Sequence, residues 1–542
     1  MMRKAFAVLL IAVFIAVASG SLSAAPGDTV KSIAIPYTCP QGLTYDGEYL
    51  WNVDRKSDMI YKINPQAGEV VDSLPSPGYV PRGLTWDGQR LWVIDAEEGL
   101  IFGINPKTRI VEKTIYCPVS KPFGLTWDGE YLWIADDSED KLSRISPEDG
   151  TTIQSMAAPT THPGGLTFDG KYLWVSDRYK NMIYMLTPDR GDVIIYFEAP
   201  GPHSCGLAYD GANLWNVDYE TDLIYKLVVD DGTKFTRRNA KHEKVEFLHQ
   251  VRNYGPGPVK ELDVYLAVPE NLNNQDIVGD VVFTPEPTDY LTDKWGQKVA
   301  HFQFDNLSAT RFVDVSLHIE AKLYDTRYYI FPENVGSLSD IPREIREKYL
   351  VDDAKFSLSN EAIQKGVKEA VGEETNAYWI GRNIYEYVMK HVRYELAGGW
   401  DIAPTVLSRG TGSCSEFTFV FIAMCRAAGL PARYVGSLAI RGDDASWDDV
   451  FHRWAEIYLP NYGWIPADPS RGDSEWPAER ADSFGHISNR LLITTGGGGG
   501  SEYLEWGYND NERWTSEGRT KVVVENFAEW SPVVSSSETT DQ

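Results

Sequence analysis

A motif that returns every 41 residues dominates the first half of this chain. The run Gly-Leu-Thr-Tyr-Asp-Gly begins at Gly42, and related runs begin with Gly at positions 83, 124, 165 and 206. A Leu-Trp pair follows each copy, and an Asp stands three residues after each Trp. A period of about 40–45 residues with several short strands per unit is typical of β-propellers. The sequence therefore predicts a five-bladed all-β propeller over residues 29–235.

The same repeat indicates how the ring of blades closes. Residues 30–36 align with the last strand of a repeat, although they precede the first Gly-Leu-Thr, and the fifth repeat lacks that strand. We expect the N-terminal strand to complete the fifth blade, because a closed ring then leaves no free strand edge. We interpret the recurring Asp as a turn cap, with a ring of metal ligands as the alternative. The recurring residues are Asp54, Asp95, Asp136, Asp177 and Asp218.

The N-terminus has the features of a secretory signal peptide. Arg3 and Lys4 precede an apolar run from Ala5 to Ala18, which is shorter than the ~20 residues of a membrane-spanning helix. We assign residues 1–25 to the signal peptide, with an uncleaved membrane anchor as the alternative. The expected location is extracytoplasmic: secreted, periplasmic or on the cell surface, with no stable membrane insertion after cleavage.

The charge and cysteine content of the chain argue against one class of partner and one class of scaffold. The chain has 51 Lys and Arg against 78 Asp and Glu, a formal net charge of −27. Such a chain repels phosphate backbones, so nucleic acid is not an expected partner. Five cysteines are too few for a disulfide-stapled scaffold. Cys39 and Cys205 begin inner strands of neighbouring blades, and either a disulfide or two free buried thiols fits that placement.

Beyond the repeats, the pattern changes twice. Short runs that alternate at period two, separated by turn formers such as those at 253–258, predict an Ig-like β-sandwich over 237–333. This stretch shows no chemical motif, and we interpret it as a spacer. From about residue 340 the pattern is helical, with helices expected at 341–350, 360–371 and 377–392. The polar end of the chain, 533–542, is expected to be disordered.

One cysteine stands in a setting that favours chemistry. Cys414 follows a Gly-containing turn and precedes an amphipathic run that ends at Gly429, so we expect it in the first turn of a helix. The helix dipole and free backbone amides there stabilise a thiolate. A thiolate used for acyl transfer needs a base and a group that orients the base. His452 in one predicted strand and Asp468 at the end of the next can supply both.

Motifs in this region are similar to the transglutaminase-like superfamily. The similarity covers roughly 370–495 and implies a papain-like α+β domain, which we place at 340–532. It implies that Cys414 is the nucleophile, His452 the general base and acid, and Asp468 the group that orients His452. The preceding β-sandwich also resembles the module found ahead of such domains. The matching runs are Gly412-Ser413-Cys414, the stretch from Arg426 to Val435, the stretch from His452 to Glu456, Gly463-Trp464 and Asp468-Pro469-Ser470.

The sequence gives less information about the groups that would bind the oxyanion in such a site. The amide of Cys414 is one expected oxyanion donor. A second donor could come from Tyr394 or Trp400, although either can equally be a packing aromatic. Because there is no zinc-ligand spacing, P-loop or dinucleotide fingerprint, we predict no metal and no cofactor.

Taken together, the sequence predicts a secreted multidomain enzyme that acts on protein or peptide amide bonds through a thioester. The acceptor decides between proteolysis, deamidation and transglutamination, and the triad is the same for all three. The propeller would be the recognition module and would present a face to a protein or glycan. The alternative is a non-catalytic extracellular binding or surface-assembly protein that uses the transglutaminase-like fold as a scaffold.

Overall fold

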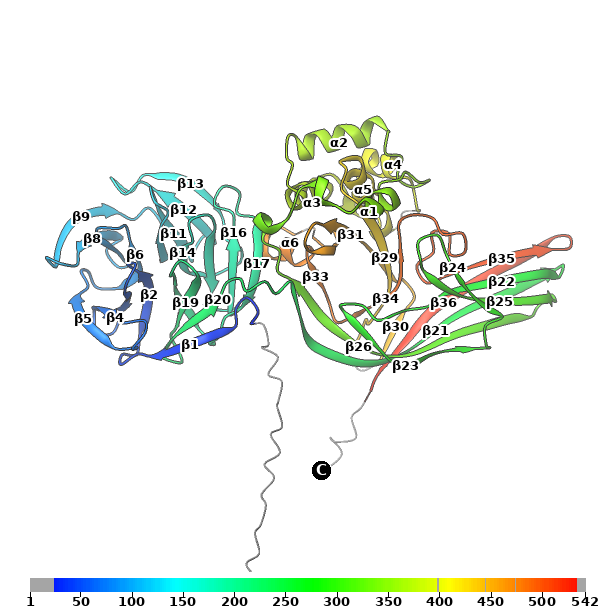
Figure 1. Ribbon diagram of the computed structural model, residues 1–542, viewed down its shortest axis with the longest axis horizontal. Coiled ribbons are helices and arrows are strands. Elements are labelled where there is room, and N and C mark those ends of the chain that lie inside the picture. The colour runs from blue at the N-terminus through cyan, green and yellow to red at the C-terminus, as the bar shows by residue number, and fades with distance from the viewer. Residues whose placement is uncertain (1–23, 397–398, 444, 473, 534–542) are drawn as a thin grey trace, which may run out of the picture.

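The computed structural model describes residues 24–396, 399–443, 445–472 and 474–533. Nearly all of the predicted signal peptide (1–25) and of the predicted disordered tail (533–542) lies outside these ranges, so both stay predictions. Two bodies stand side by side: a ring built only of short strands, and a C-terminal body of helices above long strands (Figure 1). Among the described residues, no helix is both long enough and apolar enough to cross a membrane.

The ring (residues 29–228) consists of four-stranded antiparallel sheets, one for each copy of the repeat. The first is β2 (Pro40–Tyr45), β3 (Leu50–Asp54), β4 (Met59–Ile63) and β5 (Val70–Pro75). The second is β6 (Pro81–Trp86), β7 (Leu91–Asp95), β8 (Leu100–Asn105) and β9 (Ile110–Tyr116). The third is β10 (Pro122–Trp127), β11 (Leu132–Asp136), β12 (Lys141–Ile145) and β13 (Thr152–Ala157). The fourth is β14 (Pro163–Phe168), β15 (Leu173–Asp177), β16 (Met182–Leu186) and β17 (Val193–Glu198).

The fifth sheet closes the circle. It contains β18 (Ser204–Tyr209), β19 (Asn213–Asp218), β20 (Leu223–Val228) and the N-terminal strand β1 (Thr29–Ala34). β1 pairs antiparallel with β20, with Ala34 opposite Leu223, so the predicted closure by the N-terminal strand is confirmed. The innermost strands contact each other in an unbroken cycle, from β2 through β6, β10 and β14 to β18 and back to β2.

Two Asp residues hold the turns of each repeat. Asp46 accepts the indole N–H of Trp51 at 2.7 Å, and the equivalent bonds in the other repeats measure 2.7–2.9 Å. Asp54 accepts the backbone amide of Ser57 at 2.7 Å, and Asp95 accepts that of Glu98 at 2.8 Å. These bonds satisfy backbone donors inside the turns, which confirms the interpretation of the recurring Asp as turn caps.

The cysteines of the ring are not cross-linked. All five cysteines lie in the described residues, and all are free. Cys39 and Cys205 are therefore two free thiols, which settles the two alternatives that the sequence left open. Burial raises the pKa of Cys205 to about 12, so this thiol is protonated at neutral pH.

The C-terminal body begins with two sheets that share one hydrophobic core. One sheet orders its strands β23-β26-β21-β36-β30, with β33 on β26, and the other orders them β24-β25-β22-β35. Leu262, Phe302, Val315 and Trp530 meet in the shared core. The strands are β21 (Phe235–Pro256), β22 (Val259–Ala267), β23 (Gln275–Thr284), β24 (Asp289–Thr292), β25 (Lys298–Leu307), β26 (Phe312–Tyr328), β30 (Ser446–Asp448), β33 (His486–Ile487), β35 (Asp510–Ser516) and β36 (Thr520–Pro532).

The C-terminal boundary predicted for the papain-like domain differs from what the structure shows. We had placed residues up to 532 in the papain-like domain, yet β36 pairs with β21 from Glu243 opposite Pro532 to Pro256 opposite Thr520. β35 likewise pairs with β22. The C-terminal strands thus cover edges of the sheets at 237–333, which would otherwise expose unpaired backbone groups. An alternating pattern gives no information about a pairing partner that lies more than 200 residues away in the chain.

Helices and a small sheet form the rest of the C-terminal body. The sheet orders its strands β32-β31-β29-β34, and α5 packs against β31 and β29. The three predicted helices are present as α1 (Arg343–Tyr349), α2 (Glu361–Val371) and α3 (Ala377–His391). The other elements are η1 (Pro332–Asn334), η2 (Leu338–Asp340), β27 (Arg393–Tyr394), α4 (Ala403–Arg409), β28 (Thr411–Gly412), α5 (Cys414–Ala427), β29 (Ala432–Ala439), β31 (His452–Leu459), β32 (Gly463–Ala467), α6 (Pro477–Asp482) and β34 (Leu491–Gly497).

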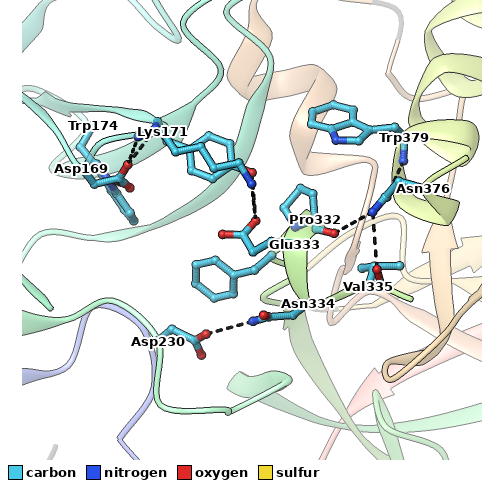
Figure 2. A network of polar contacts seen from close by, with 12 residues as sticks. Asp169, Lys171, Trp174, Asp230, Pro332, Glu333, Asn334, Val335, Asn376 and Trp379 are labelled. Atoms are coloured by element: carbon cyan, nitrogen blue, oxygen red, sulfur yellow. Dashed lines mark hydrogen bonds and ion pairs between the residues drawn. The ribbon is translucent and has the colours of Figure 1, made fainter. Parts of the chain in front are cut away.

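A polar network at η1 fastens the ring to the C-terminal body (Figure 2). The carboxylate of Glu333 accepts hydrogen bonds from Lys171 at 3.1 Å and from Tyr172 at 3.0 Å, both in the turn between β14 and β15 of the ring. Asn334 donates to Asp230 at 3.2 Å, where the chain leaves the ring. On the other side, the Asn376 amide that caps α3 donates to the carbonyl of Pro332 at 2.9 Å. The short η1 segment therefore bonds to both bodies.

Candidate active site

The three predicted site residues come from three elements that meet at one end of the small sheet. Cys414 is the first residue of α5, His452 is the first residue of β31, and Asp468 directly follows β32. β31 and β32 form the predicted hairpin, with Ala455 opposite Ala467. Because α5 packs on β31, the helix N-terminus and the beginning of that strand come together.

A buried carboxylate sets the beginning of α5. The side chain of Glu416 is fully buried and accepts the backbone N–H of Ser413, the residue before the helix, at 2.9 Å. The same carboxylate pairs with Arg409 at 2.9 Å and accepts the amide of Asp401 at 3.2 Å. It thereby ties α4 and the segment before it to the turn that presents Cys414.

His452 lies between the carboxylate of Asp468 and the thiol of Cys414. Nε2 of His452 lies 2.6 Å from Oδ2 of Asp468. The other carboxylate oxygen accepts the hydroxyl of Ser470 at 2.6 Å, which holds Asp468 in place. The Cys414 thiol and the His452 imidazole are close enough for each to shift the pKa of the other, and Nδ1 is the ring nitrogen that Asp468 leaves free. The structure thus brings Cys414, His452 and Asp468 together in the order that the sequence predicted.

This arrangement separates charge within the triad. Burial acts to raise the pKa of Cys414, but the hydrogen bond and positive charge of His452 outweigh it and lower that pKa to about 7. Burial acts to lower the pKa of His452, yet the charge and hydrogen bond of Asp468 raise it to about 9. Near neutral pH the pair therefore favours a thiolate beside an imidazolium. Cys425, in the core of the same helix, has a pKa raised by burial, which outweighs the charge of Arg426.

Tyr394 and Trp400 both lie near the thiol, on different elements. Tyr394 stands opposite Gly412 in the parallel pair β27–β28, and the charge of Cys414 contributes, after burial, to raising the pKa of Tyr394. The ring of Trp400 packs against the ring of Tyr508, with 5.6 Å between the two ring centroids. Both side chains are partly open to solvent, at 43% and 39% exposed. Their predicted role as oxyanion donors stays a prediction.

Tyr508 is a site residue that the sequence did not reveal. Its hydroxyl lies 3.6 Å from Sγ of Cys414 and bonds to the hydroxyl of Ser415. The buried guanidinium of Arg453 lies over the Tyr508 ring, 4.2 Å from its centroid. Tyr508 follows Cys414 by 94 residues and belongs to no motif, so only the folded chain places it here.

Comparison with known proteins identifies the class of this part of the chain. Residues 365–469 match the family model of the transglutaminase-like superfamily. The chain therefore carries a transglutaminase-like domain in the region where its motifs predicted one.

Two curated relatives are uncharacterised proteins. One, from Haemophilus influenzae, is 22% identical over 204 residues, which is 33% of this chain and 55% of the relative. The other, YebA of Bacillus subtilis, is 26% identical over 104 residues, 17% of this chain and 14% of the relative. The chain thus spans about half of the first relative and a small part of the second.

Two solved structures are similar to parts of this chain only at low scores. A candidate cysteine protease from Cytophaga hutchinsonii is 16% identical with a TM-score of 0.39, covering 54% of this chain and 92% of that one. A glutaminyl cyclase from Myxococcus xanthus is 15% identical with a TM-score of 0.34, covering 38% and 97%. The site assignment depends on the geometry described above and not on these likenesses.

Proposed function

We propose that the protein is a cysteine-nucleophile enzyme that acts on amide bonds of proteins or peptides through a thioester. One observation carries this proposal: Nε2 of His452 lies 2.6 Å from Asp468, and the same imidazole lowers the pKa of the Cys414 thiol at the start of α5. A nucleophile, a base and a group that orients the base are the parts that covalent acyl transfer requires.

The first step forms the thioester. The thiolate of Cys414 attacks the amide carbonyl, and a C–S bond forms. The imidazolium of His452 then gives its proton to the leaving nitrogen as the C–N bond breaks. The backbone N–H of Cys414 at the start of α5 would donate to the developing oxyanion, and Tyr394 or Trp400 would supply a second donor.

The second step releases the acyl group to an acceptor. His452, now neutral, takes a proton from water or from an amine as that acceptor attacks the thioester. The C–S bond breaks and releases the thiolate of Cys414, while the proton stays on His452, which restores the thiolate–imidazolium pair. Water gives hydrolysis of a peptide bond or deamidation of a side-chain amide, whereas an amine gives a crosslink. The same three side chains serve every outcome.

We further propose that the ring is a five-bladed β-propeller that recognises a protein or glycan partner outside the cytoplasm. Its support is the 41-residue repeat, the four-stranded sheet formed by each copy and the N-terminal run typical of a signal peptide. The formal charge of −27 again argues against nucleic acid as that partner.

Thiol labelling tests the enzyme proposal, with Cys39 as an internal control. Cys39 is more exposed than Cys414, but burial and the charge of Asp54 raise its pKa. If reactivity follows thiolate content, iodoacetamide should modify Cys414 about tenfold faster than Cys39 at pH 7. Equal or slower labelling of Cys414 would contradict an activated thiolate and favour the scaffold alternative.

Product masses identify the reaction. Peptides are incubated with the wild-type protein and with Cys414→Ala, in the presence and absence of a primary amine. Chain cleavage, loss of ammonia with gain of water, and gain of the amine give different mass shifts. The proposal predicts at least one of these shifts with the wild-type protein and none with Cys414→Ala. Identical mass spectra for the two proteins would overturn it.

A further inference from the structure

A cavity of about 450 Å³ lies between the ring and the C-terminal body, beside Asp468. The fourth sheet of the ring and its turn contribute Lys180, Tyr184 and Tyr196 to the wall. The C-terminal body contributes Trp454 and Asp468 opposite them, together with Arg471. The cavity therefore exists only because the two bodies are docked, and one wall of it is the carboxylate that orients His452.

A buried donor in this wall has no partner. Trp454 is only 2% exposed, and its indole Nε1 makes no hydrogen bond with any residue that the structure describes. The Trp454 ring stacks against His452, with 5.7 Å between the ring centroids. Because a buried N–H without an acceptor costs about 1–3 kcal/mol, this position favours a ligand that brings an acceptor.

The acidic groups of the cavity already have donors. Asp468 accepts from His452 and Ser470. Asp482 accepts from Tyr196 and lies 3.1 Å from His486 and 3.4 Å from Arg327. Glu479 accepts the hydroxyl of Ser474 at 2.6 Å. The carboxylates are thus engaged within the protein, and the positive partner of Asp468 offsets its charge.

His486 is paired with Asp482, but among the described residues the other two basic side chains of the cavity have no hydrogen-bonded partner, although the charge of Arg471 helps to lower the pKa of Asp468. Lys180, in the turn between β15 and β16, and Arg471, just after Asp468, are both exposed. Within the described ranges, neither side chain makes a hydrogen bond, an ion pair or a cation–π contact. One cation comes from each body, and both line the same cavity. The free groups are therefore an indole N–H, an ammonium and a guanidinium, which are all donors.

We propose that this cavity is a subsite for a carboxylate of a peptide, held by Lys180, Arg471 and Trp454. The proposal builds on the function proposed above, since it makes the ring one wall of the substrate-binding region. Guanidinium and ammonium groups form charge-assisted hydrogen bonds with carboxylates, and the aromatic walls of Tyr184 and Tyr196 suit the neighbouring apolar atoms. The carboxylate can be an acidic side chain or a free C-terminus.

Binding to the full-length Cys414→Ala protein tests the proposal without turnover. Three peptides are compared by titration calorimetry: acetyl-Ala-Glu-Ala-amide, acetyl-Ala-Gln-Ala with a free carboxyl terminus, and neutral acetyl-Ala-Gln-Ala-amide. We expect at least one carboxylate peptide to bind about tenfold more tightly than the neutral one, because hydrogen bonds to a charged acceptor are stronger than those to a neutral one. Preference for the first identifies an acidic side chain, and preference for the second identifies a C-terminus.

Variants on the two bodies locate the binding. Lys180→Ala, Arg471→Ala and Trp454→Phe, each in the Cys414→Ala background, should each weaken carboxylate binding about fivefold and leave the neutral peptide unaffected. Lys141→Ala is the matched control, since Lys141 is an exposed ring lysine that pairs with Glu139 away from the cavity. Lys180→Arg should restore binding that Lys180→Ala loses.

Two outcomes would overturn the subsite. One is that no carboxylate peptide binds more tightly than the neutral peptide. The other is that carboxylate binding survives Lys180→Ala and Arg471→Ala unchanged, which would place it elsewhere. Neither result bears on the thiol, because these proteins lack Cys414. Conversely, absence of turnover by the wild-type protein, with carboxylate binding intact, would reject the enzyme proposal and retain the binding site.

Discussion

The charge on Asp468 determines the protonation of both other members of the triad. Burial acts to raise the pKa of this carboxyl, but His452 outweighs burial and keeps that pKa below its usual range. In return, Asp468 raises the pKa of His452, and the resulting imidazolium lowers that of Cys414. The thiolate form of Cys414 therefore depends on His452 and Asp468 as well as on Cys414 itself.

Activity should pass through a maximum between about pH 7 and pH 9. The rate should rise as Cys414 loses its proton, with a pKa of about 7, since the thiolate is the nucleophile. It should fall as His452 loses its proton, with a pKa of about 9, because the leaving nitrogen then lacks a proton donor. The measurement is kcat/KM against pH, and a rate that still increases above pH 10 would contradict the ion pair.

Replacing Asp468 by Asn should abolish the pH range of high activity. Without the negative charge the pKa of His452 falls, so the imidazolium is lost near neutral pH and the pKa of Cys414 rises. We expect turnover to fall on the order of 10²–10⁴-fold, as when the carboxylate of a triad is lost. The pH dependence of iodoacetamide labelling should shift upward by at least one unit. Asp443→Asn, which alters an exposed carboxylate paired with Arg490, should change neither quantity.

At the scale of elements, the position of the thiol depends on how α5 begins. Glu416→Gln removes the charge that holds the amide of Ser413 and the guanidinium of Arg409. We expect a loss of about 2–3 kcal/mol in the free energy of unfolding, because bonds to a buried charged acceptor are lost.

Urea unfolding and Cys414 labelling measure the two consequences of this change. Labelling near pH 7 should slow as the turn before Cys414 loosens. Glu361→Gln is the control, since Glu361 is an exposed acid in the first turn of α2. Equal stability of the Glu416→Gln and Glu361→Gln proteins would show that the buried network does not set the helix start.

The strand β1 is the element that completes the ring. Ile33 is 3% exposed and packs with Leu43, Trp215 and Ile224, which join the fifth sheet to the first. Ile33→Ala should destabilise the ring by about 2–5 kcal/mol through lost burial and a cavity. Tryptophan fluorescence during heating reports on both bodies, since each contains Trp residues, and the midpoint of the ring's transition should fall. Val30→Ala on the same strand, where Val30 is 60% exposed, should leave the midpoint unchanged.

At the scale of the whole molecule, η1 couples the two bodies. Glu333→Ala removes the acceptor of both Lys171 and Tyr172. These groups are partly exposed, so the loss should be only about 1 kcal/mol and the fold should persist. Hydrogen exchange should nevertheless accelerate in residues 332–335 and in the facing turn at 169–172.

Glu286→Ala is the control for this change, since Glu286 is exposed in a loop at 285–288 of the C-terminal body. Its exchange pattern should match that of the wild-type protein. Unchanged exchange at 332–335 in Glu333→Ala would mean that packing alone holds the two bodies together. The cavity beside Asp468 would then be insensitive to this network.

Local patterns accounted for much of this fold. The helix that begins at Cys414, the hairpin of β31 and β32, and the pairing of β1 with the last repeat all follow from periodicity, turn residues and alignment of the repeats. Each of these features depends on neighbours in sequence or on a repeated unit. For that reason one chain without any alignment is sufficient to predict them.

Such local patterns do not predict which distant segments of the chain pair with each other. The sheet partner of β36 is β21, and the hydroxyl beside Cys414 belongs to Tyr508. Neither contact has a periodic signal, because many strands and many aromatic residues of this chain would satisfy the same local rules. The choice among them depends on which surfaces remain uncovered once the rest of the chain has folded.

The sequence by itself determined the repeated unit of the ring through its spacing, and it indicated the three residues of the proposed triad through local context and resemblance to a known family. Only the tertiary structure decided the charge state of that triad and the cavity next to it. Burial and mutual distance shift the pKa values of Cys414 and His452. The docking of the fourth sheet brings Lys180 to the same cavity as Asp468, which follows it by nearly 300 residues. Both effects depend on distances in space, and those exist only in the folded chain.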